Sequence, residues 1–214
     1  MKKIFLIATL LISSISFSQS GMKTTFNLIG GERFSSYVFH NSSQQKSNDI
    51  GYVMYNTFGI NAELNLNRNI IRPGISFYQA GAKTLNSGTN INWRTSHLAF
   101  NLSYLYSAYD GKVFSLRPGL GFGFNYMLSG DQTIGSTRLN IITEKSLKRF
   151  DIEAFVSLNA KFQVTSLFSV GAEYRFGYGL LQIETDPQQK TSNINHCLLL
   201  NLGFTIAKGV GSRL

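Results

Sequence analysis

The sequence predicts an all-β protein, an eight-stranded antiparallel up-and-down transmembrane β-barrel that follows a cleavable signal peptide. Three observations favour this fold class. Apolar and polar residues alternate over long segments, and period 2 is the side-chain period of a β-strand. Several segments run for roughly 11–15 residues, which suits strands that cross a bilayer and exceeds the about 5–6 residues common in soluble sheets. Long polar connections alternate with short ones, as in outer-membrane barrels.

The composition supports a β-protein rich in aromatic residues. The 214 residues include 20 Gly, and 13% are aromatic, whereas only 14% are charged against roughly 25% in typical soluble domains. So much Gly disfavours a helical bundle, because Gly costs about 1 kcal/mol in a helix interior. So many aromatic residues exclude a disordered chain. Uncharged polar residues replace the missing charges.

The formal net charge is +9, but the basic residues are scattered along the chain. The closest cluster is Lys145, Lys148 and Arg149, and no basic stripe is interleaved with aromatic residues, so we expect no nucleic-acid partner. The single cysteine, Cys197, excludes an internal disulfide and a multi-cysteine metal site. No metal, nucleotide or phosphate motif occurs in the sequence, and we expect no cofactor.

Residues 1–18 have the layout of a secretory signal peptide, and residues 19–214 are expected to form the barrel domain. Lys2 and Lys3 precede an apolar run, and small serine residues stand before a cleavage point after Ser18. The apolar run is too short to cross a bilayer as a helix. The chain is therefore expected to be exported.

The first four strands are expected over 24–31, 50–64, 71–77 and 98–108. Each segment carries apolar residues at every second position, although the alternation is fainter here than later in the chain. Their apolar faces contain Phe26 and Leu28, then Tyr52, Met54, Phe58, Ile60 and Leu64, then Ile71, Ile75 and Phe77, and then Leu98, Phe100, Leu102, Tyr104 and Tyr106.

The last four strands are expected over 114–128, 150–162, 168–180 and 194–206. In each of them the even positions are almost entirely apolar and the odd positions are mostly polar or Gly. Their apolar faces include Leu116, Leu120, Phe122, Phe124 and Tyr126, then Ile152, Val156, Leu158 and Phe162, then Val170, Tyr174, Phe176 and Tyr178, and then Leu198, Leu200, Leu202 and Phe204.

The connections alternate in length around this barrel. Asp110-Gly111 is a good two-residue hairpin turn. We expect the short turns and both termini on the periplasmic side, and the long loops outside the cell. The long connections are 32–49, 84–96, 129–149 and 184–193, and the short ones are 65–69, 109–112 and 163–167. Aromatic residues near the strand ends are expected to form interfacial girdles, with Phe114, Phe162, Phe168 and Phe204 on one side and Tyr126 and Tyr178 on the other.

The apolar positions are expected to face lipid and the polar positions to face inward. Hydrocarbon offers no hydrogen bonds, so every backbone polar group must pair within the protein, and a closed barrel achieves this. Eight strands leave only enough room for side chains, and confined charges must be paired. We therefore expect an internal polar plug, with a substrate or proton path as the alternative, formed by Glu63, Arg72, Arg117, Asp151, Glu153, Lys161, Glu173 and Arg175.

Several segments resemble the PorT-like family of outer-membrane β-barrel proteins of Gram-negative bacteria. The resemblance covers roughly residues 23–208. It implies an eight-stranded barrel in the outer membrane, and it assigns no activity. The segments that carry it are Arg72-Pro73-Gly74-Ile75-Ser76-Phe77, Gln79-Ala80-Gly81-Ala82-Lys83, Leu116-Arg117-Pro118-Gly119-Leu120-Gly121, Val170-Gly171-Ala172-Glu173-Tyr174-Arg175-Phe176-Gly177-Tyr178-Gly179-Leu180 and Leu202-Gly203-Phe204-Thr205-Ile206.

No residue set points to catalysis, so we expect a non-enzymatic outer-membrane protein that serves as envelope structure, scaffold or adhesion module through its external loops. The expected partners are outer-membrane lipid, the barrel-assembly and secretion machinery, and a protein at the external loops. One alternative is a rim-located lipid hydrolase, for which His40-Asn41-Ser42 offers His and Ser on one face; neither His97 nor His196 has a nucleophile and an acid beside it. The other is a soluble lipocalin-like barrel that binds a ligand.

Overall fold

The computed structural model describes residues 23–40, 43, 45–47, 49–84, 90–186 and 188–206. Its long strands form one antiparallel ring in which β1 pairs with both β3 and β11 and thereby closes the barrel. The eight strands of the ring are β1 (Lys23–His40), β3 (Val53–Leu66), β4 (Asn69–Thr84), β5 (Ile91–Tyr106), β7 (Phe114–Ile134), β9 (Phe150–Gln163), β10 (Phe168–Gly179) and β11 (Lys190–Ile206). The predicted signal peptide, residues 1–18, lies outside the described residues.

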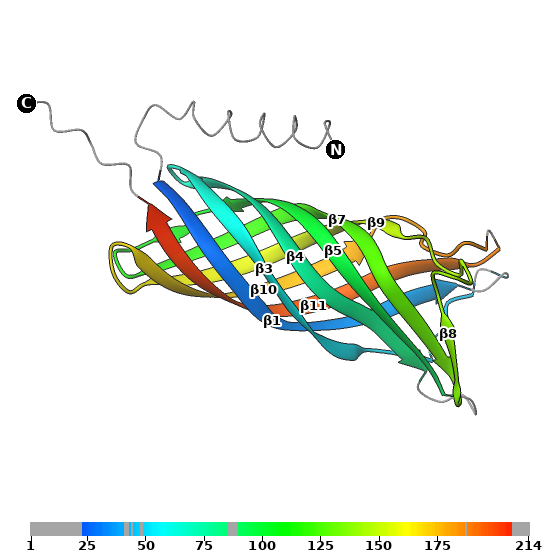
Figure 1. Ribbon diagram of the computed structural model, residues 1–214. Helices are drawn as coiled ribbons and strands as arrows, with labels where there is room; N and C mark the ends of the chain where they lie inside the picture. The colour runs from blue at the N-terminus through cyan, green and yellow to red at the C-terminus, as the bar shows by residue number, and fades with distance from the viewer. Residues whose placement is uncertain are drawn as a thin grey trace, which may run out of the picture.

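Chain neighbours are also spatial neighbours, so the topology is up-and-down as predicted. Figure 1 shows the strands tilted around a cylinder, with the start of β1, the end of β11 and the turn between β9 and β10 at the same end. Three short strands attach to the ring. These are β2 (Ile50–Gly51) on β4, and β6 (Tyr109–Asp110) and β8 (Thr137–Asn140) on β7.

The side chains alternate between the two faces of this ring as the sequence predicts. The apolar face is the outer one: Leu200 is 64% exposed and Phe58 is 56% exposed, whereas the side chain of Asn195 points inward and is fully buried. A soluble protein does not surround itself with a continuous belt of Leu, Ile and Phe, because the exposed apolar area would drive aggregation. The outer surface therefore faces lipid, and the lipocalin-like alternative is wrong because the interior is polar.

Several strands extend further than predicted at the long-loop end. β1 continues to His40, β5 begins at Ile91, β7 continues to Ile134 and β11 begins at Lys190, so large parts of the expected loops 32–49, 84–96, 129–149 and 184–193 are strand. The apolar alternation stops where the lipid ends, but the backbone ladder needs no apolar side chains to continue. The barrel therefore projects beyond its apolar belt at this end.

Two further local expectations are corrected. The expected strand 50–64 is interrupted, because Ile50–Gly51 pairs with β4 and β3 begins only at Val53. Asp110 pairs with Ser115, so the turn lies after Asp110 and the Gly111 amide donates to the Phe114 carbonyl over 2.9 Å. Asp110-Gly111 is thus the entry to the turn and not its centre.

Short turns connect the strands at the other end. Leu66 pairs with Asn69, which leaves Asn67 and Arg68 as a two-residue turn, and Asn67 has a φ of 59°. Asn tolerates this left-handed conformation better than most residues, and tight hairpins require it. Among the described residues, no helix is long and apolar enough to cross a membrane.

Candidate functional site

All eight charged residues that were predicted to face inward are buried, and the most exposed of them, Arg117, is only 9% exposed. They project from five strands, β3, β4, β7, β9 and β10, into the barrel lumen. A barrel of eight strands is narrow enough for such side chains to meet across its axis. Seven of the eight take part in three cross-barrel clusters.

The middle cluster consists of Arg72, Glu173 and Arg175. Arg72 on β4 donates two hydrogen bonds to the Glu173 carboxylate on β10, Nη1 to Oε2 over 2.7 Å and Nη2 to Oε1 over 2.9 Å. Arg175 Nη2 donates to Oε1 of the same carboxylate over 3.0 Å, and its guanidinium lies 4.2 Å from the centre of the Phe155 ring. One buried carboxylate thus holds two buried guanidinium groups.

The inner cluster consists of Glu63, Arg117 and Lys161 and lies toward the short turns. Glu63 Oε2 accepts from Arg117 Nη1 over 3.0 Å and from Lys161 Nζ over 2.7 Å. Both cations therefore share one carboxylate oxygen. Buried ions are tolerated only when they are paired, since removal from water is costly.

The outer cluster consists of Arg33, Glu153 and Asn195. Arg33 Nη2 donates to Glu153 Oε2 over 2.5 Å, and Asn195 Nδ2 donates to the same oxygen over 2.9 Å. The Arg33 guanidinium also lies 3.9 Å from the centre of the Tyr78 ring, a cation–π contact.

Sequence reasoning placed Arg33 in a loop and so missed its role as the partner of Glu153. Thr25 and Asn27 show that the odd positions of β1 face inward. If this alternation is extended along β1, Arg33 is also predicted to face inward. Conversely, Asp151 is buried but joins no ion pair with any residue that the structure describes. Its Oδ1 accepts from the Leu181 amide over 3.4 Å instead.

The outer mouth of the lumen, at the long-loop end of the barrel, is closed by apolar side chains. Above the outer cluster, Tyr78 stacks on His97 with ring centres 5.0 Å apart. The connections β7–β9 and β10–β11 then fold inward and bring Ile141, Leu147 and Ile183 together over the opening. Among the residues that the structure describes, the apolar cap comprises Tyr37, Ala82, Met127, Ile141, Leu147 and Ile183, with Ile50, Trp93 and Ile142 packed against it.

A hollow of about 400 Å³ lies beside the apolar cap. Glu184 on its wall accepts a hydrogen bond from the Thr191 hydroxyl over 2.9 Å, and partial burial raises the pKa of its carboxyl above the ordinary value. The cap residues Tyr37, Ile141 and Leu147 form part of its wall.

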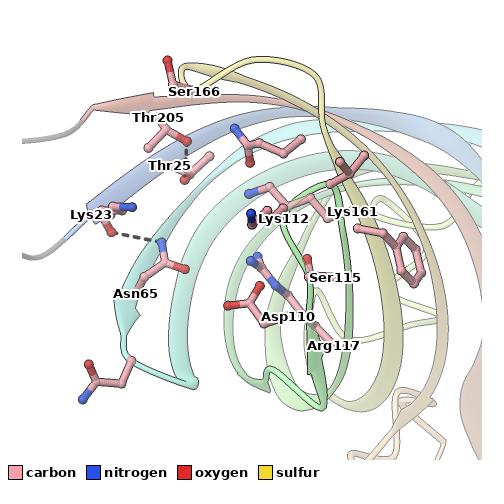
Figure 2. Close-up of a pocket in the computed structure, with 15 residues that line it drawn as sticks. Lys23, Thr25, Asn65, Asp110, Lys112, Ser115, Arg117, Lys161, Ser166 and Thr205 are labelled. Carbon is pink, nitrogen blue, oxygen red and sulfur yellow. Dashed lines mark hydrogen bonds between the residues drawn. The ribbon is translucent and has the colours of Figure 1, made fainter.

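The inner mouth differs, because it contains an open polar cavity of about 630 Å³. Its walls carry Lys23, Lys112, Arg117 and Lys161, and Asp110 is the one acidic residue that the described part of the chain adds to them. Figure 2 shows these side chains around the same opening, with Thr25 and Thr205 joined by a hydrogen bond of 2.9 Å at its edge.

The histidine and cysteine residues form no catalytic set among the described residues. His97 lies within β5, rather than before a strand as expected, and its Nε2 is 2.8 Å from Thr95 Oγ1. His196 contacts the Tyr174 hydroxyl through Nδ1 over 2.7 Å on the outer face. Cys197 points inward, as expected, and is buried.

His40 ends β1, whereas Asn41 and Ser42 of the expected rim motif lie outside the described residues. Within the described part of the chain, no three His, Cys, Asp or Glu side chains gather in a way that could hold a metal ion.

Comparison of the sequence with protein-family models and with curated proteins gave no match. Among solved structures, a major outer membrane protein from Thermus thermophilus is similar with a TM-score of 0.54 and 13% identity, over 87% of this chain and 100% of that one. Neisserial surface protein A has a TM-score of 0.46 and 15% identity, over 88% and 98% of the two chains. The Ail protein of Yersinia pestis has a TM-score of 0.43 and 13% identity, over 88% and 100%. The similarity to the Thermus thermophilus protein shows that the chain has the fold of an outer-membrane β-barrel.

Proposed function

We propose that this protein is a non-conducting, non-enzymatic barrel of the outer membrane that serves as a scaffold or adhesion module through its external end. The observation that carries the proposal is the filled lumen. Three ion-pair clusters cross it in succession, and an apolar cap closes its outer mouth. A solute that crossed would have to break buried ion pairs, so a steady aqueous path is not expected.

The external end supports a role in presenting a binding surface. β1, β5, β7 and β11 continue beyond the apolar belt, and β8 adds a further strand to β7. Binding surfaces are commonly built on loops that a rigid scaffold positions. A protein partner at these connections, outer-membrane lipid around the belt, and the assembly and secretion machinery are the partners that we propose. Membership of the PorT-like family is part of the same proposal.

Conductance measurements test the proposal directly. The purified protein, inserted in planar bilayers, is expected to give no steady current. Glu173→Gln together with Glu63→Gln removes the carboxylates of the middle and inner clusters, and it is expected to give no steady current either, because the outer cluster and the apolar cap remain. Stable, ion-selective channels from the wild-type protein would overturn the proposal.

Fractionation tests the location. The protein is expected in the outer-membrane fraction, where it should require detergent for release and should migrate differently on a gel before and after heating. Recovery in the soluble periplasmic fraction without detergent would contradict the proposed location. Pull-down with the external connections then identifies the partner.

A lipid hydrolase at the rim is not favoured by any contact that the structure describes. Esterase activity on detergent-dispersed lipid that disappears in Ser42→Ala would nevertheless establish it and overturn the non-enzymatic assignment.

A further inference from the structure

The cavity at the inner mouth has an excess of positive charge. Lys23, Lys112, Arg117 and Lys161 line it, and Asp110 is the one acidic residue on its wall among those that the structure describes. Glu63 lies beneath the cavity and offers one carboxylate to two of these cations. With Glu63 added to the lining residues, the inner mouth has four basic groups and two acidic ones, and such a concave basic surface attracts anions.

Arg117 has hydrogen-bonding capacity that the protein leaves unused. Its side chain is nine-tenths buried and donates to Glu63 through Nη1, but within the described part of the chain the buried Nε has no hydrogen-bond partner. Arg117 also lines the cavity, and because it shares one carboxylate oxygen of Glu63 with Lys161, its positive charge is only partly balanced there.

The cationic groups come from separate parts of the barrel and line one space. Arg117 projects from β7 and Lys161 from β9, and Lys112 belongs to the turn between β6 and β7. The Ser115 residue, which pairs with Lys161 across the two strands, adds a hydroxyl to the same wall. Donors that converge from several directions suit a tetrahedral oxyanion with several acceptor oxygens better than one planar carboxylate.

We propose that the inner mouth is a binding site for an oxyanion of the phosphate class, with Arg117, Lys112 and Lys161 as its ligands. In the orientation typical of outer-membrane barrels the short turns face the periplasm, so the ligand enters from that side. The phosphate group belongs either to a diffusible phosphate compound or to the headgroup of an anionic lipid in the inner leaflet. The site is independent of the proposed role of the external end.

Calorimetric titration of the detergent-solubilised protein with inorganic pyrophosphate tests the site. The wild-type protein is expected to bind at one saturable site. Lys112→Gln, an exposed turn position, is expected to weaken binding about tenfold, because it removes one charge-assisted hydrogen bond. Glu63→Gln is expected to tighten binding, because it frees Arg117 and Lys161 from their internal counter-ion.

Lys190→Gln is the matched control, because it removes an exposed lysine at the opposite end of the barrel. It is expected to bind pyrophosphate as the wild type does, and unchanged heat-modifiable mobility shows that each variant is folded. The proposal is overturned if the wild type shows no saturable binding, or if Lys190→Gln weakens binding as much as Lys112→Gln.

Nanodiscs of two compositions distinguish the sources of the phosphate group. Equal pyrophosphate affinity in phosphatidylcholine and phosphatidylglycerol discs supports a diffusible ligand. If the wild type binds pyrophosphate more weakly in phosphatidylglycerol discs than in phosphatidylcholine discs, and Lys112→Gln shows no such difference, the lipid headgroup competes for the site. Loss of wild-type binding in phosphatidylcholine discs contradicts the site altogether.

Discussion

Arg72 on β4 and Glu173 on β10 face each other across the lumen and form a two-point ion pair with distances of 2.7 and 2.9 Å. The two strands are not neighbours in the ring, so this contact spans the barrel interior. The ion pair links two opposite walls of the barrel that share no backbone hydrogen bonds. The polar interior thus has a structural consequence, because it fixes the shape of the cylinder from within.

Glu173→Gln is expected to lower the free energy of unfolding by about 3–5 kcal/mol, because it leaves Arg72 and Arg175 buried without their shared counter-ion. Urea titration of the protein in lipid vesicles measures the change. Asp131→Asn is the control: it breaks the exposed ion pair with Arg138, and exposed pairs contribute little. A Glu173→Gln variant as stable as the control would contradict the structural role of the middle cluster.

Gly31→Ala is expected to disturb the seam between the first and last strands. A Cβ at this position would clash with the Leu198 carbonyl oxygen on β11, so the backbone would have to shift. Such overpacking is expected to lower the free energy of unfolding by about 1–3 kcal/mol. Gly30→Ala is the matched control, because no atom lies within 4 Å of its added methyl group. Equal folding yields for the two variants in vesicles would refute the close approach.

Leu200→Arg is expected to destabilise the protein by about 2–4 kcal/mol, because Leu200 projects from the outer face of β11 within its apolar alternation, where the barrel contacts hydrocarbon. Leu200→Ile keeps the side chain apolar and should change little. Reversible unfolding from vesicles measures both. If Leu200→Arg left the free energy of unfolding unchanged, position 200 would have to contact water and not lipid.

Cys197 is expected to resist a water-soluble maleimide in the folded protein and to react once the protein is denatured. The thiol is buried next to Asn195 in the filled lumen, with Sγ 3.5 Å from Asn195 Oδ1. Lys190→Cys in a Cys197→Ser background supplies an accessible control. Rapid labelling of folded wild-type protein would indicate a water-filled channel.

The sequence predicts the strands and their faces well, because a period of 2 is a local property. It cannot predict which charges meet, because Arg72 and Glu173 are 101 positions apart and their contact depends on the tilt and register of the whole ring. Arg33 was missed because β1 continues after its apolar alternation ends. The apolar cap was missed because Ile141 and Ile183 lie outside the strands of the ring and show no periodic pattern.

The most direct test of the inside-out arrangement is a spin-label scan along β11 in a Cys197→Ser background. Labels at Leu198, Leu200 and Leu202 are expected to collide with lipid-soluble oxygen and to be shielded from a water-soluble nickel complex. Labels at Asn195 and Asn201 are expected to be protected from oxygen. The opposite pattern, with the leucines shielded from oxygen and the asparagines accessible to the nickel complex, would contradict the membrane barrel.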